Sequence, residues 1–157
     1  MSEKNDMEIA IAIKILKIGW NWIIAGFKKK SFNEIKASSS ILFIDDEQLS
    51  IVRLLKRDSW NVRQIKNTPT LDDPEIVRSN VIFIDVVGIG EDLSKENKGA
   101  ELAKLLKNKY SKKYIIISSN YVQLRSPQEF SHDWIQKNAP ISDFVNIIEK
   151  GIKFSGI

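Results

Sequence analysis

The chain of 157 residues contains no cysteine and a single histidine, His132. The lack of cysteine excludes a disulfide framework, thiolate zinc sites and cysteine nucleophiles, and it suits a reducing compartment. A histidine without a second histidine or a cysteine is a poor metal ligand. We therefore predict a surface position for His132, just before the last strand.

The main body of the chain also lacks an excess of charge of one sign. Residues 37–157 hold 17 basic and 16 acidic side chains, whereas residues 1–36 hold seven lysines against four acids. A nucleic-acid-binding domain usually carries a basic stripe, which this body does not show. The sequence also lacks internal repeats and low-complexity tracts, and its length suffices for one well-cored domain.

Short apolar runs alternate with helical patterns from residue 40 onward. Strands are predicted at 41–44, 60–65, 81–86, 114–117 and 134–136, and helices at 47–57, 74–78, 96–109 and 140–152. Only a short helix fits within 120–130, because Ser126-Pro127 interrupts it. This pattern predicts an α/β fold, a flavodoxin-like doubly wound five-stranded parallel sheet preceded by an N-terminal helix. We place an N-terminal extension at 1–37 and the domain at 38–157.

Polar side chains follow four of the predicted strands. Asp45 and Asp46 follow the first, Asp85 and Ser118 end two others, and Lys137 closes the last. In open parallel sheets the carboxyl ends of the strands form the ligand-binding edge. A single aspartate after a strand is often a turn or helix cap, but four agreeing strand ends favour a site for Mg²⁺ and phosphate.

These residues resemble a known family, the receiver domain of two-component response regulators. The resemblance rests on Ile-Leu-Phe-Ile-Asp-Asp-Glu (41–47), Val-Ile-Phe-Ile-Asp (81–85), Ile-Ile-Ile-Ser (115–118) and Lys137, and covers about residues 40–153. It implies that Asp85 accepts a phosphoryl group. It further implies a Mg²⁺ site made by Asp46 with support from Asp45, by Asp85 and by the backbone carbonyl of Val87.

The resemblance also assigns three further positions. Ser118 matches the hydroxyl that hydrogen-bonds the phosphoryl group, and Lys137 matches the ammonium that neutralises it. Trp134 matches the aromatic residue whose rotamer reports activation, although a plain core or edge aromatic explains this residue equally well.

The resemblance implies a single-domain response regulator rather than an enzyme. A histidine kinase or phosphotransfer protein would phosphorylate Asp85, and the output would be a contact with an unidentified protein, in the cytoplasm. One alternative is a receiver-like interaction module that acts without phosphorylation. Another is a Mg²⁺-dependent phosphatase of the haloacid-dehalogenase type, although such enzymes need a second aspartate where this chain has Val87.

Three features depart from the family pattern. Lys137 is followed by Asn138 instead of proline, so we expect a different backbone there and expect Pro140 to start the last helix. The loop from Gly88 to Lys98 is long, either a solvated loop or a lid over Asp85. The fourth helix of the domain is short, which would alter the usual docking surface.

The N-terminal extension carries an apolar segment from Ile9 to Phe27, followed by three lysines. Its polar residues Lys14, Lys17 and Asn21 form one narrow stripe of a helix. Two lysines in a segment this short disfavour a membrane span, and the charge pattern disfavours a secretory signal. The helix is expected to pack on the domain, to form a homodimer or to bind a membrane surface through residues 9–30.

Overall fold

The computed structural model describes residues 31–86, 98–120 and 127–156. Its strands are β1 (Ile41–Ile44), β2 (Val62–Ile65), β3 (Val81–Asp85), β4 (Tyr114–Ser118) and β5 (Asp133–Ile135). Its helices are α2 (Phe32–Ser38), α3 (Ser50–Arg57), α4 (Pro74–Arg78), α5 (Lys98–Lys109), α6 (Pro127–Phe130) and α7 (Ile141–Ser155).

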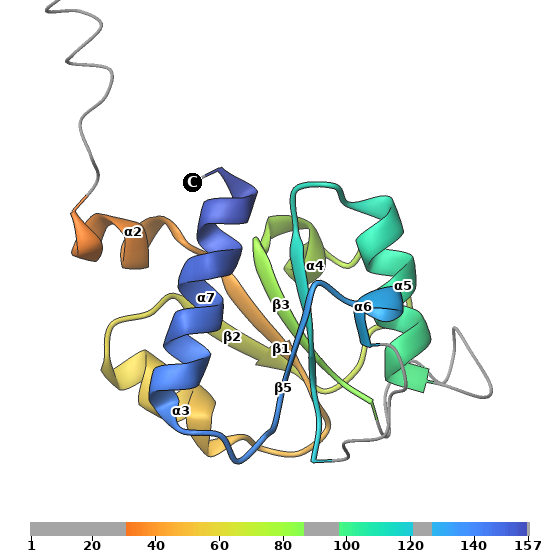
Figure 1. Ribbon diagram of the computed structural model, residues 1–157, viewed down its shortest axis with the longest axis horizontal. Helices are drawn as coiled ribbons and strands as arrows, with labels where there is room; N and C mark the ends of the chain where they lie inside the picture. The colour runs from red at the N-terminus through yellow and green to blue at the C-terminus, as the bar shows by residue number, and fades with distance from the viewer. Residues whose placement is uncertain (1–30, 87–97, 121–126, 157) are drawn as a thin grey trace, which may run out of the picture. The chain divides into compact units, whose positions relative to one another are not determined.

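The five strands form one parallel sheet in the order β2-β1-β3-β4-β5 (Figure 1). The order reverses direction at β1, since the chain first moves outward to β2 and then back across to β3. This is the doubly wound arrangement that the alternation of apolar strands and helices predicts, and the predicted fold class is confirmed. The crossovers place β1, β3 and β4 in the interior, which explains why these strands are apolar on both faces.

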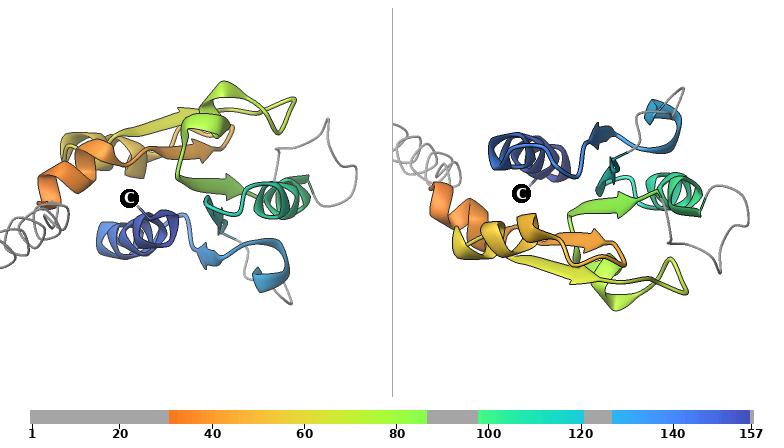
Figure 2. Two further views of the ribbon diagram at one scale, coloured as in Figure 1. Left: turned by 90° about the horizontal axis from the view of Figure 1, so that it is seen from above. Right: turned by 90° about the horizontal axis from the view of Figure 1, so that it is seen from below.

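Each face of the sheet is covered by its own helices, as Figure 2 shows. Alternate residues of β1 and β3 point to opposite faces, so Phe43 and Phe83 pack under α3 and α7, whereas Ile44 and Ile84 pack under α4 and α5. The rings of Phe43 and Phe83 stack with centroids 4.4 Å apart, and Phe144 of α7 packs against both. This core fixes β1 and β3 in register.

Two of the predicted departures from the family pattern, the short fourth helix and the segment from Lys137 to Pro140, fall on described residues and are confirmed. Helix α6 is only four residues long. Pro140 immediately precedes α7 as its N-cap residue, and no peptide bond of the described residues is cis. The peptide between Lys137 and Asn138 is therefore trans, as the cost of a cis bond before a residue other than proline leads one to expect.

Helix α2 is held to the domain by one buried lysine. The Nζ atom of Lys36 donates to the carbonyl oxygen and the carboxylate of Asp58, at 2.9 and 2.7 Å, and lies 5.2 Å from the centre of the Trp60 ring. The chain divides into two units between Phe32 and Asn33, so most of α2 belongs to the larger unit. The boundary at 37/38 stays a prediction.

The predicted surface position of His132 is wrong. The imidazole is half-buried and stacks on Tyr114 with ring centres 5.0 Å apart, while its Nδ1 accepts the backbone N–H of Ile115 at 3.0 Å. Burial, and next the charge of Lys107, lowers the pKa of His132. Sequence reasoning missed this because the aromatic partners, Tyr114 and Phe154, come from β4 and α7.

We expect His132→Asn to reduce the loss of stability on acidification. The pKa of His132 in the folded state lies below the unfolded value of 6.5, so the unfolded chain takes up the proton first as pH falls. The neutral ring therefore contributes fully above that value and progressively less below it. Urea unfolding at about pH 7.5 and about pH 5.5 measures the difference. Equal losses in wild type and variant would contradict the assignment.

None of the helices among residues 31–86, 98–120 and 127–156 is long and apolar enough to cross a bilayer. The apolar segment from Ile9 to Phe27 lies outside the described residues. Its three expected fates, packing on the domain, dimerisation and binding to a membrane surface, stay predictions.

Candidate phosphate and metal site

Strand register brings the predicted site residues to one edge of the sheet. Asp85 is paired with Ser118 across β3 and β4. Ile44 is paired with Ile84 across β1 and β3, so Asp45, the next residue, lies beside Asp85. The two apolar runs, Ile41–Ile44 and Val81–Ile84, have equal lengths and pair residue by residue, so the aspartates that follow them lie side by side.

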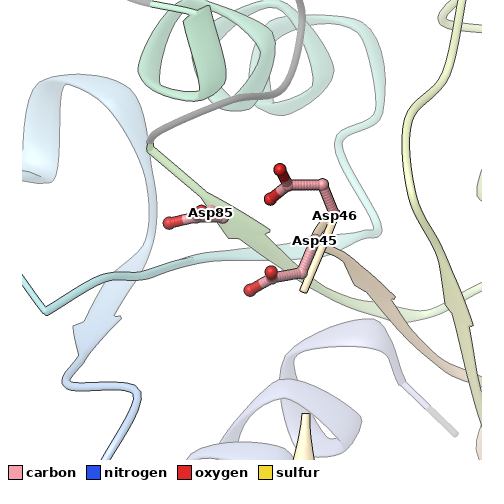
Figure 3. Close-up of side chains that lie close together, drawn as sticks. All are labelled: Asp45, Asp46 and Asp85. Carbon is pink, nitrogen blue, oxygen red and sulfur yellow. The ribbon is translucent and has the colours of Figure 1, made fainter. Parts of the chain in front are cut away.

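The three carboxylates gather around one point (Figure 3). Asp45, Asp46 and Asp85 each offer an oxygen atom, and these atoms all lie within 4.8 Å of one another. Asp45 and Asp85 are buried, and Asp46 is exposed. Carboxylate oxygens at this spacing, with one side open to water, suit a Mg²⁺ ion that keeps several water ligands. The donor set therefore fits the expected metal.

Lys137 supplies the positive charge that balances the buried carboxylates. Its Nζ atom lies 2.8 Å from Oδ2 of Asp45, 2.9 Å from Oδ2 of Asp85 and 3.8 Å from Oε2 of Glu47. Burial opposes the charged ammonium, but the short contacts with Asp45 and Asp85 and their negative charges outweigh it and raise the pKa of Lys137. The lysine therefore stays protonated throughout the neutral range.

Two buried oxygen atoms of this site are left without a hydrogen-bond partner among the described residues. They are Oγ of Ser118 and Oδ2 of Asp45; the second lies close to Lys137 but in an ion-pair geometry. A buried hydroxyl without a partner costs free energy unless something else satisfies it. Ser118 stands beside Asp85 in the register, so a group attached to the Asp85 carboxylate would lie where this hydroxyl can reach it.

Gln64 holds the loop that carries Asp45 and Asp46, and sequence reasoning missed it. Its Nε2 donates to the carbonyl oxygens of Asp45 and Glu47, at 3.1 and 2.5 Å, and its Oε1 accepts the N–H of Leu49 at 3.4 Å. In a helix that began at residue 47, the backbone groups of Glu47 and Leu49 would lie in the first turn. The contacts explain why α3 begins at Ser50 instead of the predicted residue 47.

Gly99 is a second residue that sequence reasoning missed. It lies at the start of α5, and a Cβ atom there would overlap the backbone carbonyl oxygen of Asp85. Its N–H also donates to the carbonyl oxygen of Val86 at 3.4 Å. Only glycine lets the helix approach the end of β3 this closely. A glycine in the first turn of a predicted helix is a signal that could have revealed the contact.

The remaining predicted positions have different outcomes. Trp134 lies on β5, partly buried against the α4 and α5 face of the sheet, and its switch role stays a prediction. Val87, whose carbonyl was expected to bind the metal, and the loop residues 88–97 lie outside the described residues, so the lid also stays a prediction.

Solved structures similar to this chain are response regulators and their receiver domains. NtrX from Brucella abortus in complex with ATP has a TM-score of 0.59 and 16% identity, and the match covers 76% of this chain. A CheY-like receiver domain protein from Methanospirillum hungatei has a TM-score of 0.57, 16% identity and coverage of 75% of this chain and 96% of that one. A response regulator from Thermotoga maritima has a TM-score of 0.58, 17% identity and coverage of 74% and 98%.

These likenesses define the class of fold: the chain has the fold of response regulator receiver domains, as the sequence resemblance predicts. The chain spans only 28% of the length of NtrX, whereas it spans nearly all of the two shorter proteins. No family model and no curated protein matches the sequence.

Proposed function

We propose that this chain is a phosphoacceptor switch in which Asp85 receives a phosphoryl group. The observation that carries the proposal is the convergence of Asp45, Asp46, Asp85 and Lys137 beside the hydroxyl of Ser118, which has no hydrogen-bond partner within the described part of the chain. A carboxylate oxygen of Asp85 attacks phosphorus, an O–P bond forms, and the N–P bond to the donor histidine breaks while its electron pair returns to the imidazole. The donor is a histidine kinase or a phosphotransfer protein.

The other residues of the site bind and neutralise. Asp45, Asp46 and Asp85 would hold Mg²⁺, which supplies positive charge next to the transferring phosphoryl oxygens. The Lys137 ammonium neutralises a further phosphoryl oxygen, and the Ser118 hydroxyl donates a hydrogen bond to another. The added group carries about −2 charge, so it draws Lys137 and Ser118 toward residue 85. That movement would present a changed surface to an output protein.

Asp85→Ala is expected to abolish phosphorylation by acetyl phosphate in the presence of Mg²⁺. A shifted band on a Phos-tag gel detects the phosphorylated wild type, and EDTA should remove it. Asp73→Ala is a suitable control, because Asp73 caps α4 and lies outside the acidic cluster. A band that survives in the Asp85 variant would exclude this phosphoacceptor.

Gln64→Leu is expected to weaken Mg²⁺ binding by about tenfold or more, as the loss of supporting contacts around metal ligands commonly does. The variant removes the three hydrogen bonds that hold the loop of Asp45 and Asp46. Isothermal titration calorimetry with Mg²⁺ measures the change. Gln48→Leu is the matched control, since Gln48 is exposed in the same loop. Equal Mg²⁺ affinity in both variants would show that Gln64 does not position the ligands.

A further inference from the structure

A groove with an apolar floor and basic walls runs between α3 and β2. Its volume is about 450 Å³. Its lining includes three aliphatic and three basic side chains, namely Leu49, Val52 and Ile65, and Arg53, Lys56 and Lys66, together with Asp46, Gln48 and Gln64. We call it the α3–β2 groove. It lies at the edge of the sheet, because β2 pairs with β1 alone.

The basic side chains of the groove have no carboxylate partner among the residues that the structure describes. Two acids elsewhere in the domain already pair with other cations: Asp58 pairs with Lys36, and Glu75 pairs with both Arg63 and Arg78. Arg53, Lys56 and Lys66 are all exposed and form no such ion pair within residues 31–86, 98–120 and 127–156.

The groove carries a net positive charge even with its one acid counted. Asp46 also lines the groove, against the three cations. Successive turns of α3 present Arg53 and Lys56, three residues apart on one side of the helix. Lys66 follows β2 across the groove. A ligand lying along the groove would thus meet cations from both walls.

The groove suits a ligand that has an apolar group as well as negative charge. Val52 is buried, and Leu49 and Ile65 are half-buried. A large aliphatic side chain of a ligand that packs on these residues would be removed from water, which favours binding. A free phosphate or a nucleic-acid backbone satisfies the cations but not this floor.

We propose that the α3–β2 groove docks an acidic segment of a partner protein, in which carboxylates flank large aliphatic side chains. The carboxylates pair with Arg53, Lys56 and Lys66, and an aliphatic side chain rests on Val52. Charge complementarity sets the orientation and the rate of association, and the apolar contact slows dissociation. The contact does not require phosphorylation of Asp85.

The test is selection of a random linear peptide library, displayed on phage, against the full-length chain. Enriched peptides are expected to be rich in Asp, Glu and large aliphatic residues. Charge reversal in Arg53→Glu/Lys56→Glu is expected to weaken their binding by about tenfold or more, as measured by fluorescence anisotropy. Lys112→Glu/Lys153→Glu is the matched control with the same change in net charge, since both lysines are exposed on other elements.

Three further measurements test whether the binding is specific to the groove. The affinity for the selected peptides should be unchanged in Asp85→Asn. The docking proposal can therefore be tested even if the phosphorylation proposal fails. Thermal unfolding confirms that the charge-reversed variant is folded, and wild-type backbone amide shifts on peptide addition should centre on Val52 and Ile65.

Three outcomes would overturn the proposal. The first is an absence of enriched peptides, or enriched peptides that are not acidic or bind the charge-reversed variant equally well. The second is binding of inorganic polyphosphate or DNA as tight as that of the peptides, which would mark a general anion site. The third is a dimer of the chain that Arg53→Glu/Lys56→Glu dissociates, which would assign the groove to a second copy.

Discussion

Lys137→Met is expected to lower the free energy of unfolding by about 3 kcal/mol in Mg²⁺-free buffer, the usual cost of stranding buried charges. Lys137 is the shared cation of Asp45 and Asp85, whose side chains are 2% and 5% exposed. Without it, two neighbouring carboxylates repel each other in a poorly solvated place. Added Mg²⁺ should restore more stability to the variant than to the wild type, because binding to the folded state stabilises it.

The measurement is urea unfolding with and without Mg²⁺. Lys150→Met serves as the control, because its ion pair with Asp133 is exposed and should be worth less than about 1 kcal/mol. If both lysine variants lose the same small amount, Lys137 does not balance the buried carboxylates. The Met variant should also be phosphorylated more slowly by acetyl phosphate, since in the proposed mechanism the ammonium neutralises the phosphoryl group.

Gly99→Ala is the second substitution for which we expect a large effect. The new methyl group would overlap the carbonyl oxygen of Asp85, so α5 must move away from the end of β3. Forcing an extra carbon into a closely packed contact typically costs about 1–3 kcal/mol, and here the displaced backbone belongs to Asp85, the proposed phosphoacceptor. We therefore expect both a loss of stability and a loss of Asp85 phosphorylation.

Gly156→Ala separates these two effects. Gly156 ends α7 with φ of 75°, and a Cβ atom there meets nothing within 4 Å. Its replacement should cost about 1 kcal/mol through backbone strain alone and leave phosphorylation unchanged. Circular dichroism melts and Phos-tag gels on both variants measure stability and phosphorylation. Normal phosphorylation in folded Gly99→Ala would show that the α5 contact does not position Asp85.

Much of the fold could be predicted because the strong signals are local. The apolar runs of β1 and β3 are unbroken and each is followed directly by an aspartate, so their burial and their register follow from the same few residues. The convergence of Asp45, Asp46 and Asp85 follows in turn from parallel strands that end at one edge. Helical spacing of apolar residues likewise predicted α5 and α7 to within a few residues.

The missed features depend on contacts between residues distant in sequence. The sequence of the strand that contains Gln64 gives no sign of a special role, and only the fold brings its side-chain amide to the loop before α3. His132 reads as a polar residue before a strand, but Tyr114 and Phe154 enclose it. The sequence places Lys36 in a basic extension, but in the structure it is buried and contacts Asp58 and Trp60. No local sequence pattern predicts these contacts between distant residues.

The most direct test of the central claim locates the phosphoryl group itself. The full-length chain is incubated with acetyl phosphate and Mg²⁺, the acyl phosphate is reduced with borohydride, and the peptides are analysed by mass spectrometry. The account predicts homoserine in place of aspartate at position 85, dependent on Mg²⁺ and absent when EDTA is added. Reduction at another residue, or none in the folded protein, would contradict the assignment of Asp85 as the phosphoacceptor.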